Sequence, residues 1–582
     1  MSIDFDVAAL EALFFLGHTP GRPDAPIIYP AEKDQRPHLA YYGTTRSGKT
    51  FAIEYALRQL AEDRSAGFCF IDPHASGYWR MASFLRQMDI TERVLFWDIN
   101  DPEYIVTYDP FGFPNQSPSY IAGNLTAAVL ATLGQQDDPS KQALLKTMTE
   151  TGLLALLKLK LPFLLANNLF DPEDQDFKRA VHKLVGAGML GALAEVPKIL
   201  DRYRELGAPY RRFENLFQDD RLKLTFITGG LDFKKLMDER WIVLVNTEPR
   251  DQSDEAATLF IRLLVKSLFM AAKQREASDD PAPFFLAIDE ASRYLTTDTA
   301  RILKETAKYG LYLLLGMQGL EQAKLENEES YLALRENVNG EIVMRLVDQD
   351  EKMFFTRRFL GDYLDLEKVK YEETHTTAVP RTVAHVTRAV SHSTVAGGSS
   401  GQSRPSSLHR TGGTTFEDSN YSTTDGETET PAFHVEYDYE PTTTKWFYTP
   451  DELEREAARD FSVRQEGQGQ RFGMARVNER PPTKIEIPEI DAPMYSRNEM
   501  VAWLRTFKAT QPATLPLVEA KQRFDSVIAK HVQLLTQDTS TISLEHEPPA
   551  TRQPKQGAAV TLKPATGTKT TSPRKKREEE PS

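Results

Sequence analysis

The stretch YYGTTRSGKT, from Tyr41 to Thr50, contains the spacing Gly-x4-Gly-Lys-Thr. It follows the apolar run HLAYY and precedes FAIEYALRQL, whose pattern is helical. This order is typical of a phosphate-binding loop, because glycines let backbone N–H groups turn towards an anion and the following helix adds positive charge at its N-terminus. The loop residues expected to bind nucleotide are Gly43, Thr44, Thr45, Arg46, Ser47, Gly48, Lys49 and Thr50.

Two residues of this loop have side chains that fit the chemistry of a nucleotide. Lys49 is expected to reach the β and γ phosphates, and the Thr50 hydroxyl is expected to bind Mg²⁺. The sequence contains no Asn-Lys-x-Asp motif of the kind that reads a guanine base. We therefore expect the cofactors to be ATP and Mg²⁺ rather than a guanine nucleotide.

Two apolar runs end in an aspartate, at Asp72 and at Asp289, and only the second continues with another acid, Glu290. Hydrolysis benefits from two carboxylates with different tasks, one on the metal and one on the attacking water. The pattern predicts that Asp289 binds Mg²⁺ and that Glu290 orients or deprotonates the water. Asp72 is the alternative candidate for the metal.

Two further residues lie at or near the ends of strand-like runs. Gln318 ends YLLLGMQ, where an amide beside the phosphates would sense the γ-phosphate; an equal alternative is that it caps the next helix. Arg345 lies within EIVMRLVD and would stabilise transition-state charge, across a subunit boundary if it acts as an arginine finger. A structural ion pair is an equal alternative for Arg345.

Length and composition bound the class of protein. A chain of 582 residues is too long for one core, so two or three domains are expected. The single cysteine, Cys69, excludes an internal disulfide framework and a cysteine-based zinc cluster. The net charge of −14 argues against a coat that binds nucleic acid by bulk charge, although a local basic channel remains compatible with it. The apolar stretches Val7–Gly17 and Thr151–Ala166 are short for a membrane span, and we expect the second to form a buried helix pair.

Short apolar runs bounded by Gly, Asp or Asn recur between helical patterns, as is typical of strands buried on both faces. The expected fold class is α/β, with a doubly wound, mostly parallel sheet. The runs are His38–Tyr42, Phe68–Ile71, Val94–Ile99, Trp241–Val245, Phe284–Ile288, Tyr312–Gly316 and Glu341–Val347.

Changes in composition along the chain predict how it divides into domains and linkers. We expect an N-terminal segment with a short helix, then a nucleotide-binding core interrupted by an all-helical insertion whose one strand-like run is Leu224–Ile227. A Ser/Thr/Gly-rich linker, a small C-terminal α+β region and a disordered tail follow, with a hairpin expected within Phe433–Tyr448. The expected bounds are 1–37, 38–120 with 236–375, 121–235, 391–430, 431–537 and 538–582.

The end of the insertion alternates arginines with aromatic residues. Arginine with interleaved aromatics is able to hold a nucleic-acid backbone and stack its bases. The alternative that we favour is an amphipathic helix with a solvated face. The residues concerned are Arg202, Arg204, Arg211 and Arg212, with Tyr203, Tyr210 and Phe213 between them.

The ordered set HLAYYGTTRSGKT, FIDPHASGYW, WIVLVNTEPR, FFLAIDEAS, YLLLGMQGLEQ and NVNGEIVMRLVDQDE resembles the FtsK/HerA superfamily of P-loop ATPases. It is most similar to the branch of conjugative type IV secretion coupling proteins, the TraG/TraD type, over roughly residues 36–490. The resemblance implies a RecA-like core with a helical insertion and a C-terminal extension. It also implies a ring-shaped homo-oligomer, a hexamer, that hydrolyses ATP and translocates single- or double-stranded DNA.

The same resemblance assigns nucleotide binding to Gly43, Gly48, Lys49 and Thr50, the metal and water to Asp289 and Glu290, and coupling to Gln318. It implies a cytoplasmic protein, either free or attached to the inner membrane through partners such as secretion-channel or relaxase-type proteins. The chain departs from the family in two ways. Arg46 stands where a second glycine is usual, and we expect no N-terminal membrane anchor of the kind that membrane-docked members carry.

Two other functions compete with a DNA motor. One is an ATPase that delivers protein substrates to a secretion channel, and the other is a nucleotide-gated scaffold with little turnover. Glu290 beside Asp289 favours turnover, because a switch does not need the second acid.

Overall fold

A computed structural model describes residues 11–131, 139–186, 203–227, 229–250, 252–275, 280–294, 297–326, 328–346, 348–360, 376–389, 428–441 and 471–536. Residues up to Thr536 belong to one compact unit. The predicted linker, 391–430, and the predicted tail, 538–582, lie outside the described residues, except for residues 428–430, which belong to a strand and not to a linker.

The centre of the fold is an eleven-stranded sheet with the order β2-β1-β14-β13-β10-β3-β9-β8-β4-β7-β5. The strands from β10 to β5 in this order run parallel to one another, and the others join antiparallel. This arrangement confirms the predicted fold class. The strands are β1 (Ala12–Thr19), β2 (Arg22–Pro30), β3 (Leu39–Tyr42), β4 (Gly67–Asp72), β5 (Val94–Asp98), β7 (Ile242–Asn246), β8 (Phe284–Ile288), β9 (Leu311–Met317), β10 (Gly340–Val343), β13 (Arg471–Val477) and β14 (Thr483–Ile487).

The parallel strands are buried on both faces. In β3, Leu39 and Tyr41 belong to one apolar cluster and Ala40 and Tyr42 to the other. Alternate side chains of a strand point to opposite faces, so a continuous apolar run requires a helical layer on each side. All the predicted core runs form strands, although β10 ends at Val343, earlier than the predicted Val347.

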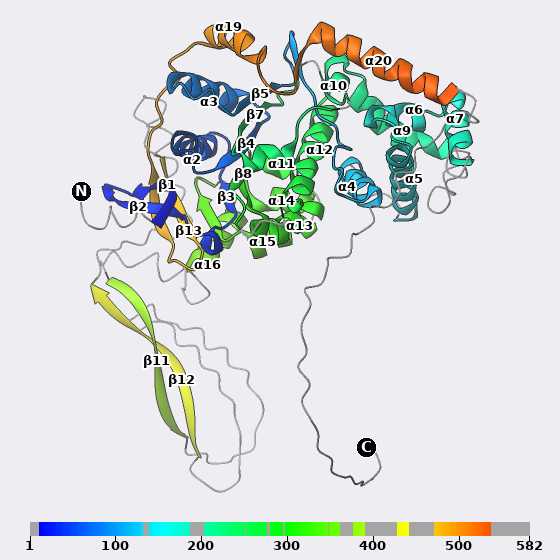
Figure 1. Cartoon of the computed structure of the whole chain (residues 1–582). Coiled ribbons are helices and arrows are strands. Elements are labelled where there is room, and N and C mark those ends of the chain that lie inside the picture. Colours follow the sequence, from blue (N-terminus) through cyan, green and yellow to red (C-terminus); the bar gives the residue numbers. More distant parts are fainter. Residues whose placement is uncertain are drawn as a thin grey trace, which may run out of the picture. The chain divides into compact units, whose positions relative to one another are not determined.

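Helices cover both faces of the sheet (Figure 1). One face packs against α2, α3 and α19, whose apolar side chains share a cluster with the strands. The other packs against α12, α13 and α15 together with the helical insertion. The helices outside the insertion are α2 (Lys49–Asp63), α3 (Ser76–Gln87), α12 (Asp254–Lys273), α13 (Thr297–Glu305), α14 (Leu320–Glu326), α15 (Glu328–Asn337), α16 (Gln349–Leu360), α19 (Arg497–Lys508) and α20 (Leu517–Thr536).

Between β6 (Tyr104–Val106) and β7, the described residues of the chain are helical or in turns. The segment Thr151–Ala166 contributes to two buried helices, as predicted, with the chain turning at Lys160, whose φ is 54°. The strand-like run Leu224–Ile227 was a wrong prediction: α10 covers its first two residues, capped by Asp219. The helices are α4 (Pro118–Leu130), α5 (Pro139–Lys158), α6 (Ala166–Phe170), α7 (Gln175–Gly186), α9 (Tyr203–Phe217), α10 (Asp220–Thr225) and α11 (Phe233–Asp238).

In the N-terminal segment, the predicted short helix stays a prediction, because residues 1–10 lie outside the described residues. The described residues of this segment form the hairpin β1–β2, with Phe14 and Leu16 buried in the cluster beneath α2. The alternation of buried and less buried positions in ALFFLGHT is that of a strand, and β1 pairs with β14 from the far end of the chain. A distant partner therefore decides its conformation, and local sequence does not reveal that partner.

The C-terminal strands also differ from expectation. β13 and β14 extend the central sheet, and β15 (Thr514–Pro516) pairs with β6. The strand β12 (Thr428–Pro441) pairs along its length with β11 (Thr376–Ala389), so the hairpin predicted within Phe433–Tyr448 has the wrong partner strand. The division of the chain into separate domains stays a prediction.

Candidate functional site

The phosphate loop lies at the carboxyl ends of the parallel strands and is fixed by its neighbours. The Gly43 N–H donates to the Met317 carbonyl, which ends β9, at 3.1 Å. The Thr44 N–H donates to the carbonyl of Arg345 at 2.8 Å. A Cβ at Gly43 would lie 2.5 Å from the Ser47 hydroxyl, so the close turn of the loop requires glycine there.

Two residues of the loop have left-handed backbone conformations. Gly48 has a φ of 106° and precedes α2, and Arg46 has a φ of 66°. The second glycine usual in the family would adopt this conformation freely, whereas a residue with a Cβ is strained by about 1 kcal/mol. Arg46 therefore keeps the loop geometry at some cost and leaves an exposed guanidinium beside the loop.

Lys49 lies inside the loop. Its Nζ donates to the carbonyl oxygens of Gly43 at 2.7 Å and Thr44 at 3.1 Å, and the residue is 5% exposed. Burial lowers the pKa of Lys49, while the nearby acids Glu290 and Asp289 act in the opposite direction. The ammonium is thus already held where an anion in the loop would meet it.

Thr50 and Asp289, which are both expected to bind Mg²⁺, lie in contact with each other. The Thr50 hydroxyl donates to Asp289 Oδ2 at 2.7 Å. Mg²⁺ in nucleotide sites is usually bound by one or two oxygen side chains together with phosphates and water. The hydroxyl and carboxylate fit that donor set, whereas the described residues include no group of three or more His, Cys, Asp or Glu that could hold a metal without a nucleotide.

Glu290 and Gln318 also meet. Gln318 Nε2 donates to Glu290 Oε2 at 3.1 Å, and the Glu290 N–H donates to Asp289 Oδ1 at 3.1 Å. Glu290 has a φ of 53°, a left-handed conformation that is strained for a residue with a Cβ. The structure thus brings the predicted acid pair and the predicted sensor into one contact network beside the loop.

Asp72, the alternative metal residue, is fully buried and its carboxylate is already occupied. Its two oxygens accept the backbone N–H groups of His74 at 2.8 Å and Tyr78 at 2.9 Å. Burial raises the pKa of Asp72, and the charge of Asp289 raises it further. A carboxylate whose two oxygens already hold the backbone around the start of α3 is a weaker candidate for the metal than Asp289.

Arg345 is joined to the loop of its own chain through its backbone carbonyl. Its side chain is partly buried, and Nε is a buried donor for which the described residues offer no hydrogen-bond acceptor. Within the described ranges Arg345 forms no ion pair. These residues therefore give no support to the alternative that Arg345 serves a structural ion pair.

The basic segment of the insertion is largely an amphipathic helix. Phe213 on α9 is fully buried and stacks on Phe170 with ring centroids 5.3 Å apart, and Tyr210 packs against the same cluster. Arg211 is exposed, and Arg212 donates to the Ala208 carbonyl at 2.6 Å. Phe213 and Tyr210 thus belong to the core, whereas the side chain of Tyr203 lies outside the description. Arg202 and the side chain of Arg204 lie outside the description.

Sequence reasoning missed an ion pair beneath the site. Glu54, one turn after Thr50 on α2, is fully buried and accepts from Arg80 Nε at 2.8 and 3.0 Å. The Arg80 guanidinium lies 4.6 Å from the ring centroid of Phe51. The pair joins α2 to α3 behind the metal side chains; the signal in the sequence is a lone acid on the otherwise apolar face of α2.

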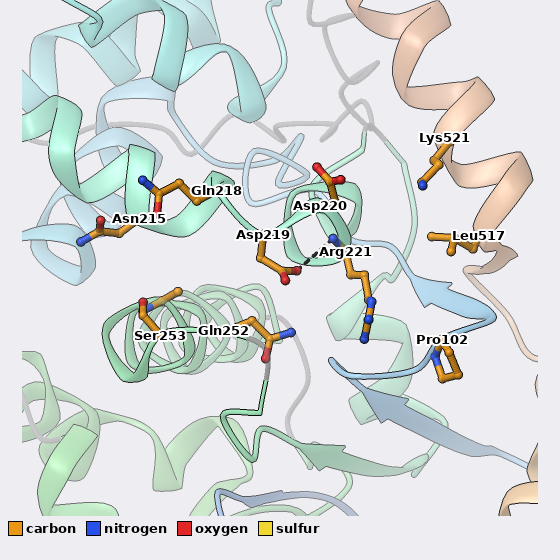
Figure 2. A pocket seen from close by; sticks show the side chains of 11 residues that line it. Pro102, Asn215, Gln218, Asp219, Asp220, Arg221, Gln252, Ser253, Leu517 and Lys521 are labelled. Carbon is orange, nitrogen blue, oxygen red and sulfur yellow. Dashed lines mark hydrogen bonds between the residues drawn. The ribbon is translucent and has the colours of Figure 1, made fainter.

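A separate cavity of about 630 Å³ lies between α9, α10, α12 and the start of α20 (Figure 2). Its lining includes none of the predicted nucleotide residues. Asp219 in its wall accepts from the Arg221 N–H, and Gln252 Nε2 donates to the Ile99 carbonyl. These polar groups already bond to the fold, and we assign no function to the cavity.

No family model and no curated protein matches the sequence. Solved structures do match. TrwB, a plasmid coupling protein, in complex with a non-hydrolysable ATP analogue is 12% identical with a TM-score of 0.48, and the match covers 84% of this chain and 91% of that one. TrwB with ADP and Mg²⁺ is 12% identical with a TM-score of 0.45, covering 84% and 94%. VirB4 of Thermoanaerobacter pseudethanolicus is 13% identical with a TM-score of 0.39, covering 63% and 93%.

At such identities and TM-scores, the function has to be inferred from this chain's own residues. Among the described helices, none is both long and apolar enough to cross a bilayer.

Proposed function

We propose that this chain is an ATPase that hydrolyses ATP with Mg²⁺ and uses the energy to translocate DNA, acting as a ring. The observation that supports hydrolysis is the contact between the Thr50 hydroxyl and Asp289 Oδ2, with Glu290 and Gln318 bonded to each other beside it. A loop that only bound nucleotide would not need this second acid.

The roles of the side chains follow from their positions. Backbone N–H groups of the loop and the start of α2 would bind the β and γ phosphates, and Lys49 would turn from its two carbonyl partners to them. Thr50 and Asp289 would hold Mg²⁺, whose charge would offset that of the phosphates. Glu290 would take a proton from the attacking water, and Gln318 would orient its carboxylate.

Two features support DNA as the substrate. The ordered motifs resemble those of DNA-pumping ATPases, and Arg211 offers an exposed cation on the insertion of a chain that is acidic as a whole. A few such contacts per subunit, repeated around a ring, would bind phosphates without a basic surface overall.

The test is ATP hydrolysis by the purified chain with Mg²⁺, measured without DNA and with single- or double-stranded DNA at several salt concentrations. We expect DNA to stimulate hydrolysis, with the effect weakening steeply as salt rises because each phosphate contact releases counterions. Lys49→Ala is the matched control and should lose most hydrolysis under every condition.

Other outcomes distinguish the competing functions. Hydrolysis by Lys49→Ala within a few fold of the wild type would contradict the assignment of the loop. Stimulation by an unfolded protein, with no response to either form of DNA, would replace the DNA motor by a protein-delivering ATPase. Nucleotide binding with almost no turnover under any condition would favour the scaffold.

A further inference from the structure

Glu351, on α16, holds the backbone that directly follows Gln318. Its Oε1 accepts the N–H of Glu321 at 2.9 Å, and the carboxylate also accepts the N–H of Leu320. These N–H groups open α14 and have no carbonyl partner within that helix. A side chain thirty residues away therefore caps the helix that starts beside the predicted sensor.

The Glu351 carboxylate lies very close to Gly319, which stands between Gln318 and the capped N–H groups. A Cβ placed on Gly319 would overlap both carboxylate oxygens of Glu351. Because two backbone donors pin the carboxylate, it is not free to swing aside. Only glycine therefore fits at position 319 while Glu351 holds this place.

Burying the Glu351 carboxylate in this place costs free energy of folding. Glu351 is 8% exposed, burial raises its pKa, and the neighbouring acids Asp348 and Glu321 add to the effect. In the described part of the chain no cation pairs with it. A carboxylate without a countercharge gives little net stability, so its contacts with the Gln318 segment are its main structural consequence.

The other end of the same connection reaches the phosphate loop. Asp348 caps α16 by accepting the Glu351 N–H at 2.9 Å, and only a short segment separates Asp348 from Arg345. The Arg345 carbonyl accepts the N–H of Thr44. Glu351 therefore links two backbone segments. One contains Arg345 and touches the phosphate loop, and the other contains Gln318.

We infer that Glu351 is a positioning residue, which holds Gln318 in hydrogen-bonding distance of Glu290 and ties that distance to the phosphate loop through α16. The inference rests on the proposed ATPase function. Without Glu351, α14 would lose its cap, and Gln318 would no longer orient the carboxylate that acts on water.

The experiment measures steady-state ATP hydrolysis by the full chain with Glu351→Ala, Gln318→Ala and both together. We expect each single substitution to lower kcat by about 10- to 100-fold, the scale for displacing a catalytic group, with KM and the affinity for a fluorescent ATP analogue within about twofold of wild type. Since both act through one contact, the double variant should be no slower than Gln318→Ala alone.

Glu351→Gln keeps the size of the side chain and one acceptor oxygen, so it should recover part of the kcat lost in Glu351→Ala. Gly319→Ala should lower kcat as well, and adding Glu351→Ala should not lower it further. Glu351→Gln also serves as the test if Glu351→Ala unfolds, with folding checked by circular dichroism.

Two results overturn the inference: a kcat for Glu351→Ala and Glu351→Gln within twofold of wild type, or losses that multiply in the double variant. Failure of the proposed function would look different, because the wild type itself would then show no hydrolysis that depends on Lys49.

Discussion

At the scale of single residues, Asp289 is the centre of the site. Its Oδ2 accepts the Thr50 hydroxyl and its Oδ1 accepts the Glu290 N–H, so one carboxylate sets both the metal side chains and the strained turn of Glu290. Gly316 on β9 leaves room for this carboxylate, because a Cβ there would lie 2.8 Å from Asp289 Oδ1.

The two acid candidates should separate in their effects. Glu290→Gln should bind ATP and Mg²⁺ and lose turnover by roughly a hundredfold, the scale for removing a positioned base. Asp72→Asn should instead lower the melting temperature, since an amide has one acceptor oxygen and cannot accept the N–H groups of both His74 and Tyr78 as the carboxylate does. The folded variant should keep its turnover. A larger loss of turnover in Asp72→Asn than in Glu290→Gln would reverse the assignment.

His38 gives a second prediction at this scale. It is buried, its Nδ1 accepts the Leu313 N–H, and burial lowers its pKa from 6.5 to about 4. The unfolded chain therefore binds a proton between these pH values and the folded chain does not. The stability from neutral His38 is complete above pH 6.5 and is lost as pH falls towards 4, by about 3 kcal/mol.

The measurement compares urea unfolding of the wild type and His38→Gln from pH 7 to pH 4. The difference in unfolding free energy should shrink as the pH falls. Asp109, whose pKa burial raises to about 6, titrates in both proteins and cancels in the difference. A difference that does not change with pH would contradict the buried neutral histidine.

The sequence singled out Thr50 and Asp289 because a phosphate loop and an apolar run that ends in two acids are both local patterns. It did not predict Glu351 or the Glu54–Arg80 pair, because these contacts join helices whose packing has no local pattern. The left-handed φ of Arg46 was not predicted either, since arginine as a residue type does not favour that conformation.

At the scale of elements, strands buried on both faces were predicted well and strands with distant partners were not. The run Phe68–Ile71 in β4 is apolar at every position, which only a central strand or a buried helix permits. The hairpin β1–β2 depends on β14 for its pairing, and its apolar stretch alone suits either a helix or a strand.

The helix α9 carries the prediction on DNA. Because Tyr210 and Phe213 pack in the core, we expect the arginines of α9 to contact backbone phosphates rather than to stack bases. Charge reversal at Arg211 and Arg212 should reduce the ratio of hydrolysis with DNA to hydrolysis without it. The matched control, Arg22→Glu with Arg64→Glu, makes the same change in net charge away from α9 and should leave the ratio unchanged. Equal losses in the two variants would point to net charge alone.

At the scale of the whole molecule, the fold leaves one question about Arg345. Its backbone lies against the loop of its own chain, whereas a finger acting in trans would send its side chain to a neighbouring subunit. We expect ATP-dependent rings, visible by light scattering or electron microscopy, with specific activity rising steeply with protein concentration.

Mixing two inactive variants decides between the positions of Arg345. If Arg345 acts in trans, Arg345→Ala and Lys49→Ala subunits should regain part of the hydrolysis when mixed. Some interfaces then join the intact loop of an Arg345→Ala subunit to the intact arginine of a Lys49→Ala subunit. No gain on mixing, or full activity from a monomer, would place the action of Arg345 within its own chain.

The order of strands in the sheet affects how the protein folds while it is being synthesised. Gly21, at the turn of the first hairpin, bonds to Glu486 on β14, 465 residues later in the chain. At ribosomal rates of about 5–20 residues per second, the hairpin waits for about 25 to 90 s before its partner strand emerges. During that interval an unpaired β-edge with apolar side chains is exposed to every other nascent chain, so the yield of soluble protein should depend on chaperones that shield this hairpin.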